Sequence, residues 1–411
     1  MTVSSAPPDP LSTDILIIGG GMAGLTLGCA LGQVGVSVVL VEPTPPDRLV
    51  SPEFDGRTTA IAAASRAILH SVGVWQAMAP EAQPILDIRV SDGSSPLFLH
   101  YDHRDVGDDP LGHIVENRII RRALLEGLAL LPNVSLLVGR RVESLDRGAV
   151  AARAILDDGG IIEARLAVAT DGRNSPTREA AGIESTAWHY PQIGIVCTVA
   201  HERDHKGVAQ EHFLPAGPFA ILPMTERRSS IVWTERADLA PALMALDDDA
   251  FRDEMALRFG DYLGGLSVVG PRFSYPLGLM HARRYIVPRL ALAGDAAHAM
   301  HPIAGQGLNI GWRDVAALAE VIVDALRLGG DPGSMVTLER YERWRRVDNT
   351  LMLAATDALN RLFSNDVAPV RLARDAGLAA VNRLAPIKQL FMRHAMGVLG
   401  DAPRLIRGEE L

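Results

Sequence analysis

The hydrophobic pattern at the start of the chain predicts a strand, a helix and a second strand. The apolar run Ile15–Ile18 has the length and β-branched composition of a buried strand. Gly19–Gly21 interrupts the pattern, and the small and apolar residues of Met22–Gln33 predict a helix. A turn at Gly35 and the run Ser37–Val41 complete a βαβ unit.

The same stretch has an alternative interpretation as a membrane span. Residues 15–41 carry no charge, and Gly20, Gly24, Gly28 and Gly32 follow the four-residue spacing of a membrane dimerisation face. Adjacent glycines weaken a helix, however, since each costs about 0.5–1 kcal/mol in a helix interior. The βαβ interpretation is therefore favoured.

Farther along the chain, helical and strand patterns alternate before the texture changes. We predict helices over 57–70, 114–131 and 308–328, strands over 134–138, 161–169 and 290–294, and a hairpin over 85–101 around an Asp-Gly turn. Between about 190 and 280, short runs separated by turn residues predict a mainly antiparallel sheet with one packed face. Residues from about 335 to 408 have a helical pattern.

Composition and charge exclude several classes of protein. The chain has 411 residues and a net charge of −9, without a basic cluster long enough to follow phosphates, which argues against nucleic-acid binding. Its two cysteines, Cys29 and Cys197, cannot form a disulfide framework and are expected to be reduced, as in the cytoplasm. Residues 1–13 have neither the basic residues nor the apolar core of a signal peptide.

The glycines of the βαβ unit form a dinucleotide-binding motif. Gly19, Gly21 and Gly24 follow one strand and open a helix, so they permit the tight turn, the approach of a pyrophosphate and close helix–sheet contact, respectively. Glu42 ends the next strand, where a carboxylate accepts hydrogen bonds from an adenosine ribose. An acid there disfavours a 2′-phosphate, so FAD or NAD is expected at this site and not NADP. The alternative is a doubly wound fold without a ligand.

Two later segments repeat the strand–turn–helix form. The pattern D-G-x-x-S-x-x-R over 171–178 is explained equally well as a turn in which Ser175 caps a helix. In the segment 293–309, Asp295 ends a buried strand and a glycine loop leads to a helix that begins near Gly307. This order suits an extended cofactor with hydroxyl groups and a ring that gains negative charge on reduction, because helix N-termini stabilise anions.

With these motifs, the sequence resembles the single-component FAD-dependent aromatic hydroxylases, a superfamily of flavoprotein monooxygenases. GGGMAG, DGRNSPTR and GDAAHAMHPIAGQGLN occur here in the order of that superfamily. FDGRTTAIAAAS, VENRIIRRAL, SYPLGLMHARRY and FMRHAMG are similar to its ubiquinone-biosynthesis branch. The resemblance covers the chain from Asp14 to about Arg407.

The resemblance implies a set of cofactor-binding residues. They are Gly19, Gly21, Met22, Ala23 and Gly24 at the FAD pyrophosphate, Glu42 at the ribose, Arg57 and Arg118 on the phosphate and ribityl side, Asp171 for both FAD and NAD(P)H, Asp295 at the ribityl chain, and Pro302, Gly305, Gly307, Leu308 and Asn309 at the isoalloxazine. Arg57 and Arg118 are alternatively solvated arginines at helix ends, and Pro302 alternatively ends a strand.

No catalytic base follows from the sequence. Pro302 and Gly305 are the candidates on the loop at the flavin edge, whereas packing or surface positions explain His189, Tyr190, Tyr275 and His281 better. His298 and His301 form an H-x-x-H pattern in a loop without a nearby acidic ligand, so no metal is expected.

The implied reaction is hydroxylation of the ring of a polyprenyl phenol or benzoquinone precursor in ubiquinone biosynthesis. In this family NAD(P)H reduces FAD, and O2 then forms a C4a-hydroperoxyflavin that transfers one oxygen atom. A single glycine motif implies that NAD(P)H binds transiently. The alternatives are an FAD-dependent prenyl reductase, a halogenase, or a non-catalytic FAD-bound scaffold subunit. The five tryptophans form no W-x-W element, which argues against the halogenase.

The resemblance and the pattern together predict the fold class and its division. We predict an α/β fold with a Rossmann-like FAD-binding domain, an inserted mainly antiparallel β-sheet substrate domain and a C-terminal helical region. The predicted ranges are 1–13 for a disordered tail, 14–84, 105–185 and 281–335 for the FAD-binding domain, 85–104 and 186–280 for the substrate domain, and 336–411 for the helical region.

The end of the chain is the most basic part of the sequence. Residues 361–407 contain eight basic and three acidic side chains, interleaved with apolar ones. One interpretation is an amphipathic segment that touches anionic lipid, since a prenylated substrate is found in the bilayer. The other is a pair of domain-covering helices with solvated arginines. The expected partners are thus the substrate and either a membrane surface, at its inner face, or a ubiquinone-biosynthesis complex.

Overall fold

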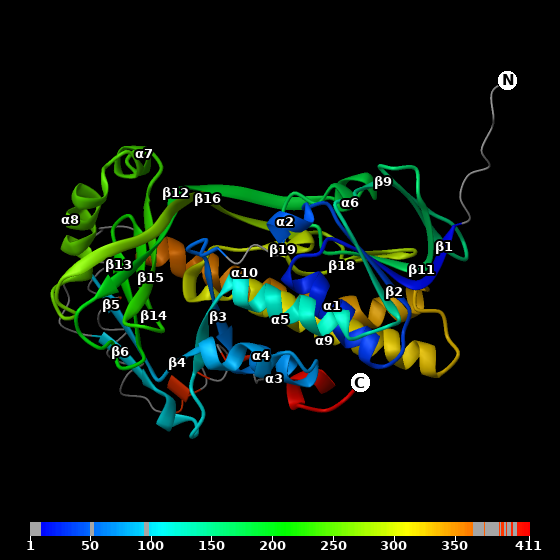
Figure 1. The fold of residues 1–411 in the computed structure, drawn as a ribbon, viewed down its shortest axis with the longest axis horizontal. Coiled ribbons are helices and arrows are strands. Elements are labelled where there is room, and N and C mark those ends of the chain that lie inside the picture. Colours follow the sequence, from blue (N-terminus) through cyan, green and yellow to red (C-terminus); the bar gives the residue numbers. More distant parts are fainter. Residues whose placement is uncertain are drawn as a thin grey trace.

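The structure, a computed structural model, describes residues 10–49, 53–93, 98–364 and 401–411, together with the single residues 374, 386, 388, 389, 392, 396 and 397. In these residues two eight-stranded sheets lie at opposite ends of the molecule, and long helices run between them (Figure 1). Within the described residues no helix combines the length and the apolar character needed to cross a bilayer.

The first sheet is the Rossmann-like core. Its path is β17-β18-β11-β1-β2-β8, with β9 and β10 attached as an antiparallel pair beside β11. The bounds are β1 (Leu11–Ile18), β2 (Val38–Glu42), β8 (Val134–Val138), β9 (Val142–Arg147), β10 (Ala152–Leu156), β11 (Ile161–Ala169), β17 (Ile286–Val287) and β18 (Leu290–Leu292). β1, β2, β8, β11 and β18 are parallel, so their carboxyl ends meet at one edge. α1 (Met22–Gln33) is the crossover between β1 and β2.

The second sheet is the inserted one; its green strands β13, β14 and β15 lie at the left of Figure 1. Its order is β19-β16-β12-β15-β14-β13-β5-β6, and every neighbouring pair is antiparallel except β13 and β5. The bounds are β5 (Asp87–Asp92), β6 (Phe98–Asp102), β12 (Ser185–His201), β13 (Val208–Leu214), β14 (Gly217–Met224), β15 (Arg228–Arg236), β16 (Leu266–Ala282) and β19 (His298–Ala299). α7 (Ala240–Met244) precedes α8 (Asp248–Phe259), whose Phe251 packs on Trp233 of the sheet.

A third, small sheet and the shorter helices complete the fold. The sheet has the order β3-β7-β4, with β3 (Thr58–Ala62), β4 (Gln83–Ile85) and β7 (Gly112–Glu116). The remaining helices are α2 (Pro46–Leu49), α3 (Ala63–Ser71), α4 (Trp75–Met78), α5 (Asn117–Ala129) and α6 (Pro176–Ala180), with single turns η1 (Ala79–Glu81), η2 (His103–Asp105), η3 (Gly294–Ala296), η4 (Ile303–Gly305) and η5 (Arg404–Arg407).

The structure confirms the predicted fold class and corrects several element boundaries. Residues 58–62 and 112–116 are strands at places where helices were predicted to begin, because they pair with each other in the small sheet. β1 begins at Leu11, inside the predicted tail, since Leu11 pairs with Ile162. Part of the predicted C-terminal helical region lies outside the described residues. The division into domains stays a prediction.

Two long helices meet around a buried carboxylate. α9 (Gly307–Arg327) carries Asp314, and α10 (Met335–Phe363) carries Arg345 and Asn349. One oxygen of the fully buried Asp314 accepts hydrogen bonds from Arg345 Nε (2.9 Å) and Asn349 Nδ2 (3.0 Å). The other contacts His298 Nε2 (2.5 Å) and accepts from the backbone N–H of Gly294 (3.1 Å). Asp314 therefore joins both helices to the segment 294–298.

The charge on Asp314 is stabilised by these partners. Burial alone would raise the pKa of its carboxyl, but His298, Arg345 and Asn349 outweigh burial and lower the pKa to about 2. Because the folded-state pKa is lowered, the ionised carboxylate stabilises the fold above its unfolded-state pKa of about 4. This contribution is lost as the pH falls from about 4 towards 2.

We expect Asp314→Asn to lower the free energy of unfolding at neutral pH by about 3–5 kcal/mol, because it removes the fully buried counter-charge of Arg345 and leaves only the partly exposed Asp348 beside that guanidinium. The exposed pair of Asp253 with Arg252 offers a control, and Asp253→Asn should have little effect. Chemical denaturation of both variants measures the difference, which should shrink as the pH falls below about 4. Equal stability of the two variants at neutral pH would contradict this account.

Candidate functional site

The three glycines of the motif at the carboxyl end of β1 differ in what a side chain at each position would contact. A Cβ on Gly24 would lie 2.0 Å from the carbonyl oxygen of Gly19, and one on Gly19 would lie 2.7 Å from that of Thr170. Both glycines are therefore required by the contact between β1, α1 and β11, and the φ of Gly19 is +109°. Gly21, which precedes α1, has no atom within 4 Å of its Cβ position. Only Gly21 faces open space, as a site for a pyrophosphate requires.

Glu42 closes the other side of this glycine turn. Its buried carboxylate accepts hydrogen bonds from the backbone N–H groups of Gly20 (2.6 Å) and Thr44 (2.8 Å). The residue predicted to bind a ribose thus also holds the glycine turn in shape. Each carboxylate oxygen has a second lone pair, so acceptance from a ribose hydroxyl stays compatible with these bonds.

Asp171 lies at the carboxyl end of β11, next to the glycine turn. Its Oδ2 accepts a hydrogen bond from the backbone N–H of Thr177 in α6 (3.1 Å). Its Oδ1 is buried and has no hydrogen-bond partner among the described residues. A buried carboxylate oxygen without a donor is costly, so this position fits a ligand that supplies one.

Asp295 is an exposed residue between two buried neighbours, Gly294 and Ala296. Burial raises the pKa of its carboxyl, and the charges of His298 and Arg173 act in the opposite direction. The preceding Gly294 lies against Ala23 of α1, where an added Cβ would be 3.5 Å from the Ala23 side chain. Asp295 therefore lies close to the start of α1 and its glycine turn.

The loop from Pro302 to Gly307 is held against β3. The Asn309 side chain donates hydrogen bonds to the carbonyl oxygens of Ala60 and Gly305 (both 2.8 Å) and accepts one from the N–H of Ala62 (2.9 Å). Asn309, predicted to line an isoalloxazine, therefore fixes the loop through its side chain. The first backbone N–H groups of α9 have no intrahelical acceptor and supply donors at this place.

Arg57 and Arg118 line one hollow of about 390 Å³, close to the start of β3. Arg57 pairs with Asp55 (2.6 Å) and is exposed, whereas Arg118 pairs with Glu116 (2.6 Å). The structure thus brings the two predicted arginines together, each beside a carboxylate. Their contact with a cofactor stays a prediction.

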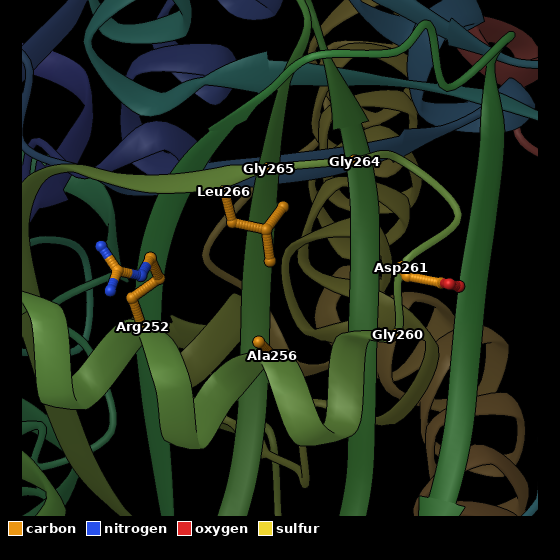
Figure 2. A pocket seen from close by; sticks show the side chains of 7 residues that line it. All are labelled: Arg252, Ala256, Gly260, Asp261, Gly264, Gly265 and Leu266. Carbon is orange, nitrogen blue, oxygen red and sulfur yellow. The ribbon is translucent and has the colours of Figure 1, made fainter.

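A larger hollow lies on the distant side of the second sheet. It measures about 610 Å³ and is bounded by the end of α8 and the loop before β16 (Figure 2). The side chains that line it are those of Arg252, Ala256, Asp261 and Leu266, beside Gly260, Gly264 and Gly265. No residue of the predicted site lines this hollow.

Sequence reasoning did not identify the buried partners of the site. Asp314 is a charged residue on a buried position of α9, between Arg313 and an apolar run that begins at Val315. The sequence signal that could have identified Asp314 was a carboxylate next to a long apolar run of the predicted helix. The two histidines of the H-x-x-H pattern have different partners. His298 pairs with Asp314, whereas His301 forms no ion pair among the described residues and accepts a hydrogen bond from the Ile303 N–H.

Comparison with known proteins identifies similar chains across nearly the full length. The family described as FAD binding domain matches residues 12–354. A ubiquinone hydroxylase, UbiL, of Rhodospirillum rubrum is 55% identical over 97% of this chain and 93% of its own. The 3-demethoxyubiquinol 3-hydroxylase of Escherichia coli is 34% identical over 94% of this chain and 99% of its own.

Solved structures with this fold include further monooxygenases. The p-nitrophenol 4-monooxygenase of Pseudomonas putida superposes with a TM-score of 0.80 at 21% identity, covering 94% of this chain and 98% of that one. PqsL of Pseudomonas aeruginosa, in complex with 2-aminobenzoylacetate, gives 0.75 at 25% identity, over 89% and 99% of the chains. The first of these shows the shared fold alone.

Substitutions at two glycines should separate folding from cofactor binding. Gly21→Ala should leave stability unchanged and weaken FAD binding about tenfold, because its methyl group occupies open space at the start of α1. Gly24→Ala should destabilise the fold by about 1–3 kcal/mol, since its methyl group collides with the Gly19 carbonyl. Thermal unfolding and fluorescence titration of deflavinated protein with FAD measure the two effects. Unchanged FAD affinity in Gly21→Ala would place the pyrophosphate elsewhere.

Proposed function

Because this chain belongs to the FAD binding domain family and, within it, to the FAD-dependent hydroxylases, we propose that it hydroxylates the ring of a polyprenyl phenol or benzoquinone precursor of ubiquinone. The chain is an FAD-dependent monooxygenase, a class that uses NAD(P)H and O2. The observation that carries the choice of substrate is the similarity, over nearly the whole of both chains, to relatives named for ubiquinone hydroxylation.

The residues at the edge of the first sheet fit an extended FAD. Open space at Gly21 would accommodate the pyrophosphate, the unpaired Oδ1 of Asp171 would accept a hydrogen bond, and Asp295 is exposed next to Gly294, which lies against Ala23 of α1. Glu42 would bind the adenosine ribose, and the N-terminus of α9 would face the ring. These positions support the proposed roles of Gly21, Asp171 and Asp295; the roles of the other predicted residues stay proposals as well.

The protein positions the reacting rings and excludes water. Bound FAD, reduced by NAD(P)H, supplies the chemistry that activates O2 for transfer of one oxygen atom to the substrate. Asn309 holds the loop 302–307 in place, and the N-terminus of α9 would stabilise negative charge on a ring bound beside this loop by about 1–2 kcal/mol. Beside this loop, an apolar cluster keeps water from the reacting atoms; it comprises Leu279, Met300, Ile310, Met352 and Leu353.

Anaerobic reduction of the flavin tests this function against its alternatives. We expect NADPH or NADH to bleach the flavin band, faster in the presence of ortho-prenylphenol, and admission of air to yield a product heavier by one oxygen atom. A flavin that neither nucleotide reduces would favour the non-catalytic scaffold. Bleaching without oxygenated product, and without O2 consumption, would favour the prenyl reductase.

We also propose that the enzyme works at the inner face of the cytoplasmic membrane, where a polyprenyl substrate is found. The predicted lipid contact through the C-terminal segment loses support, because several of its basic residues pair within the protein. Arg374 is buried against Asp92, Lys388 pairs with Asp105, and Arg404 pairs with Glu320.

The outer face of α10 supports the membrane proposal better. Between 343 and 362 its exposed side chains are Arg343, Arg346, Val347, Thr350, Leu351, Ala354, Ala355, Ala358, Leu359, Arg361 and Leu362. They recur at helical spacing, and the two carboxylates of this span, Asp348 and Asp357, are less exposed and pair with Arg345 and Arg361. This is the pattern of a helix that lies on anionic lipid. A stripe about 30 Å long on one helix is too small to hold a stable dimer by itself.

Vesicle binding of a stripe variant tests this proposal. Leu351→Glu with Leu359→Glu should reduce binding to phosphatidylcholine vesicles that contain phosphatidylglycerol about tenfold, because it places anions on the stripe. Leu257→Glu, at a still more exposed leucine of α8 (79% against 62% for Leu351 and 40% for Leu359), is the control and should bind as the unmodified protein does. Equal binding by the stripe variant, or a change in self-association instead, would overturn the membrane proposal.

A further inference from the structure

His301 is a buried side chain with one ring nitrogen left unpaired. It is fully buried in the loop between β19 and η4, directly before Pro302. Its Nδ1 accepts a hydrogen bond from the backbone N–H of Ile303 (3.3 Å). Its Nε2 is buried and has no hydrogen-bond partner among the described residues. Buried polar atoms normally find a partner, so this one calls for an explanation.

The hydrogen bond from Ile303 fixes which nitrogen carries the proton. Burial lowers the pKa of the His301 imidazole to about 4, so the ring is neutral at physiological pH. A neutral imidazole has one donor and one acceptor nitrogen. Because Nδ1 accepts from the N–H of Ile303, the proton lies on Nε2. His301 therefore presents a fixed N–H donor that lacks an acceptor.

The surroundings of His301 are apolar and aromatic. Tyr190 of β12 meets the imidazole edge-on, with 5.4 Å between the ring centres. The Tyr190 hydroxyl donates a hydrogen bond to Asp357 of α10 (2.7 Å), which anchors this ring. Tyr190 also packs on the apolar cluster of Met300, Met352 and their neighbours. The ligand that fits these surroundings is an apolar ring that bears one oxygen atom as a hydrogen-bond acceptor.

We propose that the Nε2–H of His301 donates a hydrogen bond to the ring oxygen of the phenol or quinone substrate. This proposal rests on the proposed function, and it deepens it by naming the group that orients the ring beside the loop 302–307. The free enzyme bears the unpaired donor, and bound substrate satisfies it. A ligand whose ring lacks this oxygen leaves the Nε2–H unpaired. His301 therefore favours rings that bear an oxygen atom over rings that do not.

Paired ligands and variants test the contact directly. Dissociation constants of ortho-prenylphenol and prenylbenzene, which lacks the oxygen, are measured on the FAD-loaded enzyme through the change in flavin absorbance. We expect His301→Leu to weaken binding of the phenol about tenfold and to leave prenylbenzene unchanged. His301→Gln, whose amide N–H lies close to the place of Nε2, should restore most of the affinity. The thermal midpoint of substrate-free His301→Leu should change little, because the substitution removes the unpaired donor together with the long 3.3 Å contact in which Nδ1 accepts from the Ile303 N–H.

His113 of β7 provides the matched control. It too has a buried unpaired ring nitrogen and a pKa lowered by burial to about 4, but it packs on Trp75. His113→Leu should leave the affinity for the phenol unchanged. Equal losses for both ligands in His301→Leu, or no loss for either, would overturn the proposal. Weaker FAD binding would overturn it as well, since the donor would then serve the flavin. Failure of the unmodified enzyme to hydroxylate the phenol would instead count against the proposed function.

Discussion

The buried carboxylate of Asp314 determines how the two long helices meet the segment that completes the site. An ionised group without solvent is stable only while its partners stay in place. Arg345 and Asn349 of α10 supply two of them, and His298 and the Gly294 amide supply the others. The position of Asp295, between Gly294 and His298 in the chain, is thus coupled to the packing of both helices. A structural charge pair in the interior thus helps to set the position of an exposed carboxylate.

The segment 290–309 also joins the two large sheets. β18 pairs with β11 of the Rossmann-like sheet, and β19, six residues later, pairs with β16 of the inserted sheet. The loop that follows is fixed to the small sheet by Asn309. One short stretch therefore contacts all three sheets. A cofactor bound along the carboxyl edge of the first sheet would therefore extend towards the inserted sheet, the predicted substrate domain.

Much of this arrangement follows from the sequence. The strand, glycine turn and helix at residues 15–33 were predictable because their pattern is local, and so was the position of Glu42 at the end of the next strand. The strand at 58–62 was not, since Thr58–Ala62 forms a strand only through pairing with residues 112–116. The role of Asn309 was missed for the same reason, because its partner Ala60 is 249 positions away. The unpaired nitrogen of His301 follows from burial and from a bond to Ile303, neither of which is visible in the H-x-x-H pattern.

This enzyme is expected to transfer an oxygen atom from O2 to the ring of a prenylated phenol. Turnover under isotopically labelled dioxygen, with NADPH or NADH and ortho-prenylphenol, reveals the origin of that atom through the mass of the product. We expect one labelled oxygen atom on the ring, and no label when only the water is isotopically enriched. A ring oxygen derived from water, or a phenol recovered unchanged while the flavin is reduced, would show that the enzyme does not catalyse this reaction.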